Sequence, residues 1–526
     1  MSKKEILEFC SEESLLLDNG LADFFGEIKN LEFAKDFLKK VKEFGGKRFI
    51  SNEVINSLGN SLKGDFLSLP EEHKEYLDLF VEKFSFSADT KKIPLEKNCS
   101  GENIAACVKA ISSYSVEGRP MNVKDFVNFF RSRYNDYKNI LQDNKILENL
   151  SAINKIPFEK QKFSIIGMVS SKKITKNGNL IFEVEDLTGK IKVVLSKDKE
   201  DLFSKAEEIP LDSVLGFKGF GNSEIVFVND IIFPEAQLET ARKRSPFEEY
   251  ALFLGDLHYG SKRFLEKDFL KFIDYVNGNV PNTPEVSKIK YIFFVGDLVT
   301  GIGNYPNQEG DLKIDELEKQ FQSIADILST IRKDIKIIIS PGNHDGVRIM
   351  EPQPVLNEKF AWPLYELENV IVTENPSSLN IGARGGFEGF DVLTYHGFSY
   401  TYYANTVSRL MLERAMNAPE KIMKHLLTYR HLAPEHGSVQ YFPAGKDSHF
   451  MKKIPDILVS GHTHKMGMSY FNDILLISVA SWEGMTPYQE KFGNTPDHCK
   501  VPMFNLKTRA VKILDFESKE EEKKNE

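Results

Sequence analysis

Hydrophobic residues recur at helical spacing in two places within the first 150 residues. In segment 31–45 apolar side chains lie three and four positions apart, which predicts a helix ended by the glycines that follow. A second helix is expected after Asn122, a good N-cap residue ahead of an aromatic-rich stripe. We therefore expect a helical region over residues 1–75, a polar linker over 76–120 that is open to disorder, and a helix at 121–150.

From residue 151 to 240 the pattern changes to short strands separated by turns. Five apolar runs of strand length occupy this region, and Asn177-Gly178 between the first two is a strong hairpin signal. This pattern fits a small Greek-key barrel of the OB-fold type. Such a barrel binds single-stranded nucleic acid or packs between domains, and both interpretations stay open. For the first, Lys172, Lys173 and Lys176 would supply a basic contact.

From residue 247 to 515 short apolar runs alternate with helical patterns. The clearest helix is predicted where apolar residues from Ile314 to Ile331 recur three and four positions apart. Alternation of this kind favours sheets covered by helices, with polar ligands gathered where the strands end. Residues 516–526 form a charged tail that we expect to be solvated. The chain is thus predicted to be multidomain α+β.

Composition adds limits rather than a function. The 526 residues are 41% hydrophobic and 28% charged, as in a globular protein of several domains. The sequence offers neither a membrane-length apolar run nor a signal-peptide core, so we expect a cytoplasmic protein without membrane contact. The net charge of −9 restricts any DNA-binding face to a local patch, bound metal or a partner. Four cysteines without a C-x-x-C pair predict free thiols.

Five short motifs at the ends of apolar runs carry Asp, His or Asn. Ten of the eleven histidines follow residue 250. His and carboxylate are ligands for Mn, Zn and Fe, and two such ions close together can cleave phosphoesters. Five motifs in this order argue against a chance set of structural histidines. They are Gly255-Asp256-Leu257-His258, Gly296-Asp297, Gly342-Asn343-His344-Asp345, Tyr395-His396-Gly397 and Gly461-His462-Thr463-His464.

The spacing within the motifs suggests how ligands share an ion. Asp256 and His258 are two positions apart, so in extended backbone their side chains would point the same way. The pair His462 and His464 repeats this spacing. Asp297 has two carboxylate oxygens and can bridge two ions about 3.5–4 Å apart. The neighbouring glycines would let the backbone approach the ions closely.

The ordered motifs resemble those of the calcineurin-like metallophosphoesterase superfamily. The resemblance implies a β-sandwich flanked by helices, with two divalent ions at its rim. It also implies that His344 acts on the leaving oxygen, oriented by Asp345. Mn is favoured, and Fe, Zn and Mg are the alternatives. By motif, one ion would be held by Asp256, His258, Asp297 and His464, and the other by Asp297, Asn343, His396 and His462.

A closer resemblance is to the small subunits of archaeal family D DNA polymerase, in which a barrel precedes the phosphoesterase domain. It is carried by residues 301–309, by Pro341 through Pro354, and by Tyr429-Arg430-His431-Leu432-Ala433-Pro434. The similarity covers residues 120–515. Thr300 and Trp482-Glu483 depart from the family pattern, but neither is a candidate ligand.

This resemblance implies the 3′→5′ proofreading exonuclease subunit of a two-subunit archaeal replicative polymerase. The implied partners are the large catalytic subunit, needed for polymerisation, and DNA as a primer 3′ end or single strand. A sliding clamp would be reached through the complex. Two alternatives stay open, a catalytically silent scaffold subunit and a stand-alone phosphoesterase. The complete ligand set argues against the scaffold, and the barrel with the flanking sequence argues against the stand-alone enzyme.

Overall fold

The computed structural model describes residues 107–112, 118–238 and 242–518, together with parts of segment 6–76. The chain divides into two compact units, Met1–Ile93 and Pro94–Glu526. Most of the expected linker, and the tail beyond residue 518, lie outside the described residues. None of the helices in the described part combines the length and apolar composition that a bilayer crossing needs.

The described part of the first unit includes the helices α2 (Asn19–Ile28) and α3 (Leu31–Gly45) and a parallel pair of short strands, β1 (Leu16–Leu17) and β2 (Phe49–Ile50). The side-chain oxygen of Asn30 accepts a hydrogen bond from the backbone of the third residue of α3, which fixes the start of that helix. The expected helix at 31–45 is therefore confirmed. Its apolar stripe packs in a small core that includes Phe24, Phe25, Phe33 and Phe37.

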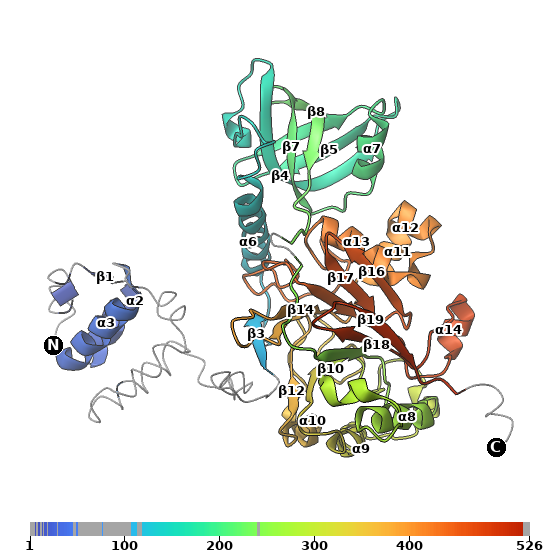
Figure 1. The fold of residues 1–526 in the computed structure, drawn as a ribbon. Coiled ribbons are helices and arrows are strands. Elements are labelled where there is room, and N and C mark those ends of the chain that lie inside the picture. Colours follow the sequence, from blue (N-terminus) through green and yellow to red (C-terminus); the bar gives the residue numbers. More distant parts are fainter. Residues whose placement is uncertain are drawn as a thin grey trace. The chain divides into compact units, whose positions relative to one another are not determined.

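The second unit begins with an edge strand, a long helix and a closed barrel (Figure 1). The helix α6 (Val123–Leu141) starts at Asn122, whose side chain forms a capping box with Asp125. The expected five-stranded OB-fold is confirmed, and its barrel closes in the order β4-β5-β6-β8-β7. Its elements are β4 (Gln161–Ile174), β5 (Leu180–Glu185), β6 (Lys190–Leu195), α7 (Glu200–Glu207), β7 (Val214–Gly221) and β8 (Ile225–Ile232).

The rest of the unit is a sandwich of two six-stranded sheets, as the resemblance implied. The first sheet contains, in spatial order, β12 (Val370–Val372), β11 (Lys336–Ser340), β10 (Ile289–Val295), β9 (Tyr250–Leu254), β18 (Lys500–Asn505) and β19 (Val511–Asp515). The second contains β16 (Gly467–Phe471), β17 (Ile474–Ser478), β15 (Ile457–Ser460), β14 (Phe390–Thr394), β13 (Ser377–Ile381) and β3 (Val108–Ser112).

Helices cover the outer face of each sheet, and Figure 1 shows the two sheets between the two groups of helices. The first sheet is covered by α8 (Glu266–Val276), α9 (Leu317–Ser329) and α10 (Glu358–Tyr365). The second is covered by α11 (Tyr400–Thr406), α12 (Ser408–Leu412) and α13 (Pro419–Thr428). Short elements complete the fold: α14 (Pro487–Phe492), η2 (Ile153–Lys155), η3 (Pro284–Lys288), η4 (Gln308–Asp311) and η5 (Ala415–Asn417).

The central strands are buried on both faces, which explains why they read as continuous apolar runs. In β9 the side chains of Leu252 and Leu254 pack under the helices, whereas Ala251 and Phe253 face the other sheet. Strands β9, β10 and β11 are mutually parallel, and so are β14 and β15. Their C-terminal ends consequently meet at one rim of the sandwich.

Two expectations from the sequence are wrong. Residues 108–112 were expected in the linker, but they form β3, which pairs antiparallel with β13. Their alternation is too short to stand out locally, because the strand is defined by its distant partner. The expectation of four free thiols also fails, because Cys107 is disulfide-bonded, although Cys10 and Cys499 are free and buried.

The helix α6 joins the barrel to the sandwich through buried polar contacts. Arg133 Nε donates to Asp447 Oδ2 at 2.5 Å, and its Nη1 donates to the carbonyl oxygen of Pro434. Tyr137 donates its hydroxyl to the carbonyl oxygen of Tyr429, whose ring is part of the barrel core. The stretch 429–434, which carried part of the family resemblance, therefore forms the seam between these domains.

Candidate metal centre

All five motifs lie at the same rim of the sandwich, each just after a strand. They follow β9, β10, β11, β14 and β15, so both sheets contribute. The structure brings six of the seven candidate ligands together with His344, in three overlapping groups whose ligand atoms lie within 4.8 Å of one another, and the seventh, Asn343, contacts two of these ligands. The groups are Asp256, His258 and His464; His258, Asp297 and His344; and Asp297, His396 and His462.

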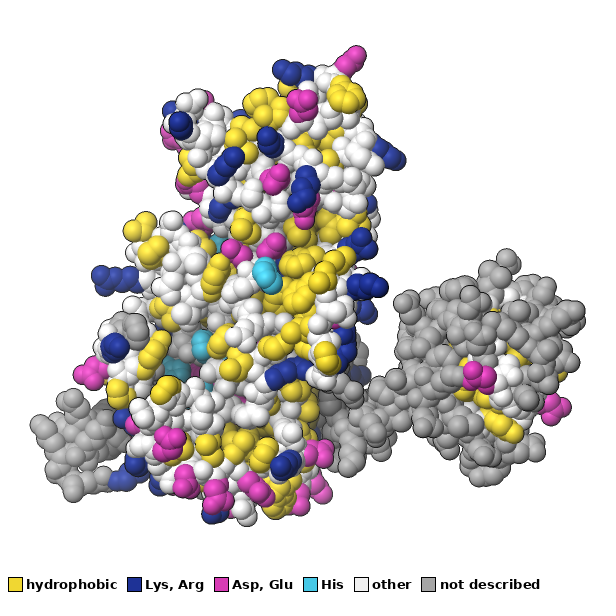
Figure 2. All heavy atoms as spheres, turned by 180° about the vertical axis from the view of Figure 1, so that it is seen from behind, with side chains coloured by type: hydrophobic (Ala, Val, Ile, Leu, Met, Phe, Trp, Pro, Cys, Tyr) yellow, Lys and Arg dark blue, Asp and Glu magenta, His cyan; other side chains and the backbone are white. Residues whose placement is uncertain are grey.

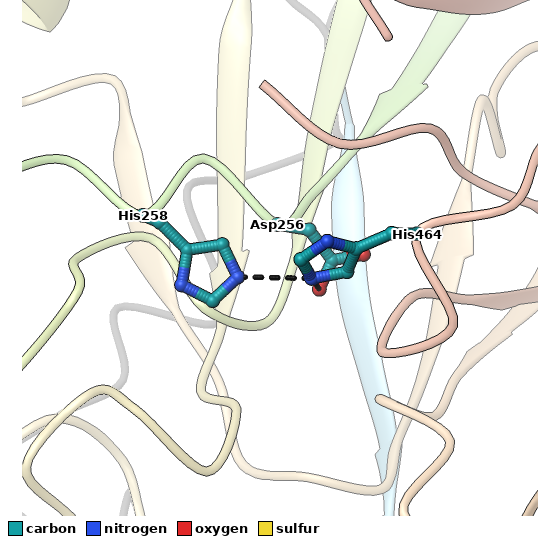
Figure 3. A group of neighbouring side chains, drawn as sticks. All are labelled: Asp256, His258 and His464. Atoms are coloured by element: carbon teal, nitrogen blue, oxygen red, sulfur yellow. Dashed lines mark hydrogen bonds and ion pairs between the residues drawn. The ribbon is translucent and has the colours of Figure 1, made fainter. Parts of the chain in front are cut away.

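The first group brings two tilted imidazole rings together through their Nε2 atoms (Figure 3). His258 Nε2 and His464 Nε2 are 3.0 Å apart, and His464 Nε2 is 3.9 Å from Asp256 Oδ1. Figure 3 shows the three side chains converging from two loops, Asp256 and His258 from one and His464 from the other. Ring nitrogens at this distance need a shared proton or a cation between their lone pairs.

The third group, Asp297, His396 and His462, lies around the carboxamide oxygen of Asn343. Asn343 Oδ1 lies 3.0 Å from His396 Nε2 and 3.1 Å from His462 Nδ1. Asp297 Oδ2 is 3.2 Å from His396 Nε2 and 3.8 Å from His258 Nε2. Asp297 thus lies next to His396 of the third group and approaches His258 of the first group, which is the position that a bridging ligand requires.

The backbone at these positions differs from the extended conformation that the spacing suggested. Five candidate ligands have φ between 48° and 69°, in the left-handed region. The expectation of extended backbone is therefore wrong, and the side chains converge because each loop turns tightly at its ligand. The adjacent glycines are needed for space: a Cβ at Gly342 would overlap the carboxylate of Asp297, and one at Gly296 would overlap the ring of His396. The five residues are Asp256, His258, Asp297, His462 and His464.

Burial sets the protonation of the site. Burial, reinforced by the nearby His344, lowers the pKa of His258 to about 3. Burial raises the pKa of Asp256 well above its ordinary value, with Asp297 as a second carboxylate beside it. For His396 burial acts downward, but Asp297 and Asp256 outweigh it and raise the pKa to about 10. The carboxylates and imidazoles are thus strongly coupled, as expected where ligands face one another without water.

His344 lies beside the ligands, and hydrogen bonds hold both its backbone N–H and its ring. Its N–H donates to Asp297 Oδ1 at 2.8 Å, and its Nδ1 lies 2.9 Å from the carbonyl oxygen of Thr300. Asp345 accepts from the backbone N–H groups of Val299 and Gly342 at 2.9 and 2.8 Å. Asp345 therefore braces the loop that carries His344. Since Thr300 contributes its carbonyl, the family departure at its side chain does not affect this contact.

Amide side chains that the sequence did not single out hold two of the loops. Asn375 Oδ1 accepts from the N–H of His396 at 2.8 Å, and Asn375 Nδ2 donates to Gln353 Oε1 at 2.6 Å. Gln353 Nε2 in turn donates to the carbonyl oxygen of Gly342 at 3.0 Å. This pair ties the loop of Asn343 to that of His396. The one signal in the sequence was the Pro-Gln-Pro run around Gln353, which contributed to the family resemblance but did not indicate a function for Gln353.

A third amide connects α14 to the site. Gln489 Nε2 lies 2.8 Å from His464 Nδ1, and Gln489 Oε1 accepts from the N–H of Thr486 at 2.9 Å. The second contact is part of the capping box that starts α14. Nothing in the local sequence signals the first contact, because it spans 25 positions.

A cavity of about 570 Å³ lies over the site. Its size falls within the range of roughly 300–1,000 Å³ typical of ligand sites. His258, Asp297 and His344 line its floor, and Tyr305 and Tyr488 are among its walls. On the face drawn in Figure 2, histidine side chains are visible in a hollow, and basic side chains are interspersed with acidic ones.

The predicted lysine contacts on the barrel separate into two kinds. Lys172 Nζ donates to the carbonyl oxygens of Glu207 and Ile209 at 2.6 and 2.8 Å, and burial lowers its pKa. This geometry favours a structural role at the end of α7. Lys173 and Lys176 are exposed, and their contact with nucleic acid stays a prediction.

The residues at the rim fit a pair of divalent ions. Two buried carboxylates, four imidazoles and one carboxamide oxygen turn their lone pairs toward one another. Such a set repels itself unless cations or protons lie between its members. Nitrogen and oxygen donors without sulfur suit Mn, Fe or Zn.

Comparison with known proteins agrees with this architecture. Residues 250–466 match the calcineurin-like phosphoesterase family, and residues 163–222 match the OB-fold nucleic acid binding domain. Fold and site thus define a metallophosphoesterase preceded by an OB-fold barrel, a class whose fold implies divalent metals.

Relatives identify the family within this class. The chain is 36% identical over 404 residues to the DNA polymerase II small subunit of Pyrococcus furiosus, covering 75% of this chain and 64% of that protein. Identity is 35% over 460 residues to the subunit of Pyrococcus horikoshii, covering 85% and 71%. It is 34% over 398 residues to that of Methanothermobacter thermautotrophicus, covering 75% and 80%. The chain belongs to the family of archaeal DNA polymerase II small subunits, which confirms the resemblance drawn from residues outside the ligands.

Proposed function

We propose that this chain is the nuclease subunit of a two-subunit DNA polymerase and removes nucleotides from a DNA 3′ end with two divalent ions. The observation that carries the proposal is the position of Asp297, whose carboxylate contacts His396 at 3.2 Å and approaches His258 at 3.8 Å. One carboxylate shared by two ligand groups is the arrangement of a two-metal phosphoesterase. A scaffold subunit has no need of it.

The two proposed ligand sets correspond to the first and third groups of side chains described above, with Asp297 in both sets and Asn343 in the second. Mn is the favoured metal, with Fe, Zn and Mg as alternatives. When bound, the ions would activate water for attack and neutralise charge that grows on the phosphoryl oxygens. The ligands are Asp256, His258, Asp297 and His464 for one ion, and Asp297, Asn343, His396 and His462 for the other.

His344 is the proposed proton donor. The carbonyl oxygen of Thr300 accepts from Nδ1–H, so Nε2 is the ring atom that, when it is also protonated, would give its proton to the departing 3′-oxygen. Asp345 contributes by fixing the loop through two backbone N–H groups. This bracing acts on the backbone of the loop, and through it keeps the imidazole of His344 in place.

Polymerisation is assigned to the large catalytic subunit. In the described part of the chain, the groups of His, Asp and Glu able to hold a metal all belong to the site above. The primer 3′ end is the proposed substrate, with single-stranded DNA contacted by Lys173 and Lys176 of the barrel. Any contact with a sliding clamp would go through the complex.

The nuclease is tested with purified protein, Mn²⁺ and a primer-template that carries a 3′ mismatch. We expect stepwise loss of 3′ nucleotides, abolished by Asp297→Asn with the fold retained by circular dichroism. Asp315→Asn, a matched change of an exposed carboxylate on the same domain, should leave the activity unchanged. Absence of digestion, both with and without the purified large subunit, would overturn the proposal.

Assembly is tested separately by mixing the chain with a purified large subunit and measuring mass by light scattering. A stoichiometric complex is expected. A nuclease that stays monomeric under these conditions would instead support the stand-alone phosphoesterase.

A further inference from the structure

We infer that Tyr305 and Tyr488 form a base-binding clamp at the mouth of the site, which receives the unpaired terminal nucleotide of a strand. This inference rests on the proposed function and names the part of the substrate that the metal ligands do not contact. Both tyrosines line the cavity of about 570 Å³ that covers His258, Asp297 and His344.

Tyr305 is placed next to the proposed proton donor. Its chain neighbour Asn304 has its Nδ2 3.2 Å from His344 Nδ1 and donates to the carbonyl oxygen of Thr300 at 3.0 Å. The Tyr305 hydroxyl donates to Asp311 Oδ2 at 3.1 Å, and Arg263 holds the other oxygen of that carboxylate at 2.6 Å. The ring is therefore fixed at both ends.

Tyr488 is likewise placed through its chain neighbour, in this case next to His464. It is the second residue of α14, and its chain neighbour Gln489 contacts His464 Nδ1 at 2.8 Å. The capping box of Thr486 and Gln489 fixes the first turn of the helix that presents the ring. Each tyrosine is thus next in sequence to an amide residue whose side chain is within hydrogen-bond distance of a histidine of the site: Asn304 precedes Tyr305, and Gln489 follows Tyr488.

Exposure distinguishes these tyrosines from structural ones. Tyr305 is 42% exposed and Tyr488 is 67% exposed, although both lie on the wall of a cavity. Tyr400 and Tyr403 of α11, by contrast, are fully buried in the core. A large aromatic surface left open beside a site of buried charge is suited to a partner with an apolar, planar face.

A nucleobase is the planar group that a phosphodiester brings with it. Stacking on an aromatic side chain contributes about 1–3 kcal/mol per base and tolerates every base, because each has a π-face. A base that is still paired and stacked in a duplex cannot offer that face. The clamp therefore selects a frayed, mismatched or single-stranded 3′ end, with the phosphate delivered to His344.

The test compares two oligonucleotides that differ only in the 3′-terminal nucleotide, one normal and one abasic. For the wild-type protein with Mn²⁺, removal of the base should raise KM by about ten-fold, which corresponds to about 1.4 kcal/mol of stacking. In the double variant Tyr305→Ala/Tyr488→Ala the two substrates should have the same KM. The single variants Tyr305→Phe and Tyr488→Phe keep the ring and should retain most of the preference.

The controls separate loss of stacking from loss of structure. Trp362→Ala removes an aromatic side chain of similar exposure, 39%, on α10 outside the cavity, and should keep the full ten-fold preference. Equal KM values for the two substrates in the wild type would overturn the clamp while leaving the nuclease intact. Failure of the wild type to cut either substrate would instead overturn the proposed function.

Discussion

Gln489 Nε2 lies 2.8 Å from Nδ1 of His464, while the same side chain caps α14 through its oxygen. One amide therefore serves both a candidate metal ligand and the helix that carries Tyr488. Partners of this kind orient a ligand, and their loss typically weakens metal binding by about 10- to 100-fold.

Gln489→Ala is expected to weaken Mn²⁺ binding at least ten-fold, measured by competition with a chelating dye. Gln489→Glu should restore or exceed the wild-type affinity, because a carboxylate can accept from both Thr486 and the ring N–H of a bound His464. Asn494→Asp puts the same charge on the cavity wall and controls for simple attraction. If Gln489→Ala binds Mn²⁺ as tightly as the wild type, the contact has no role in metal binding.

Asn375→Ala is expected to lower the free energy of unfolding by about 2–3 kcal/mol, because it leaves the buried N–H of His396 and the side-chain oxygen of Gln353 without partners. Denaturant titration gives this value. The double variant with Gln353→Ala should cost less than the sum of the single changes, since the two residues act as one connection. Strict additivity would show that they act independently.

Arg133→Met is expected to cost about 3–5 kcal/mol of unfolding free energy, because it leaves the carboxylate of Asp447 buried without its cation. Arg119 pairs with Asp125 at the start of the same helix, where solvent screens the pair, so Arg119→Met should leave the free energy of unfolding nearly unchanged. Thermal or denaturant unfolding distinguishes the two. Equal effects would mean that the buried pair does not hold the seam between barrel and sandwich.

Stability should fall as the pH is lowered from 7 to 5, in part through His425. Burial, reinforced by the positive charge of Arg409, lowers the pKa of His425 to about 3. The unfolded chain takes up this proton near pH 6.5, so a depressed folded pKa gives stability that is complete above about 6.5 and lost toward 3. The expected loss from this residue is about 2 kcal/mol at pH 5. His425→Phe should flatten the measured pH dependence by that amount, and an unchanged slope would contradict the assignment.

The sequence predicted the site well because strands deliver ligands to a rim without any need for side-chain detail. Each motif follows an apolar run, and parallel strands of one sheet end together, so Asp256, Asp297 and Asn343 had to meet if their runs were neighbouring parallel strands. The barrel was predicted for a different reason: most of its strands are neighbours along the chain, and Asn177-Gly178 marks their first turn.

What the sequence did not predict depends on contacts between distant segments. Gln489 and Asn375 carry no local signal, because an amide is equally ordinary on a surface. The strand β3 was missed because its identity comes from pairing with β13, far along the chain. The extended backbone expected between Asp256 and His258 was wrong because the spacing of two residues does not reveal that both turn into the left-handed region.

The left-handed turns at the ligands also bear on how this protein can change. Each costs about 1 kcal/mol or more for a residue with a Cβ, and Asp256, His258, Asp297, His462 and His464 all adopt one. Glycine would relieve this strain at every one of the five positions, but it would also remove the ligand. Selection for stability alone would therefore erode the metal centre first, so that the most stable descendants of this fold would be those that keep the sandwich and lose the chemistry.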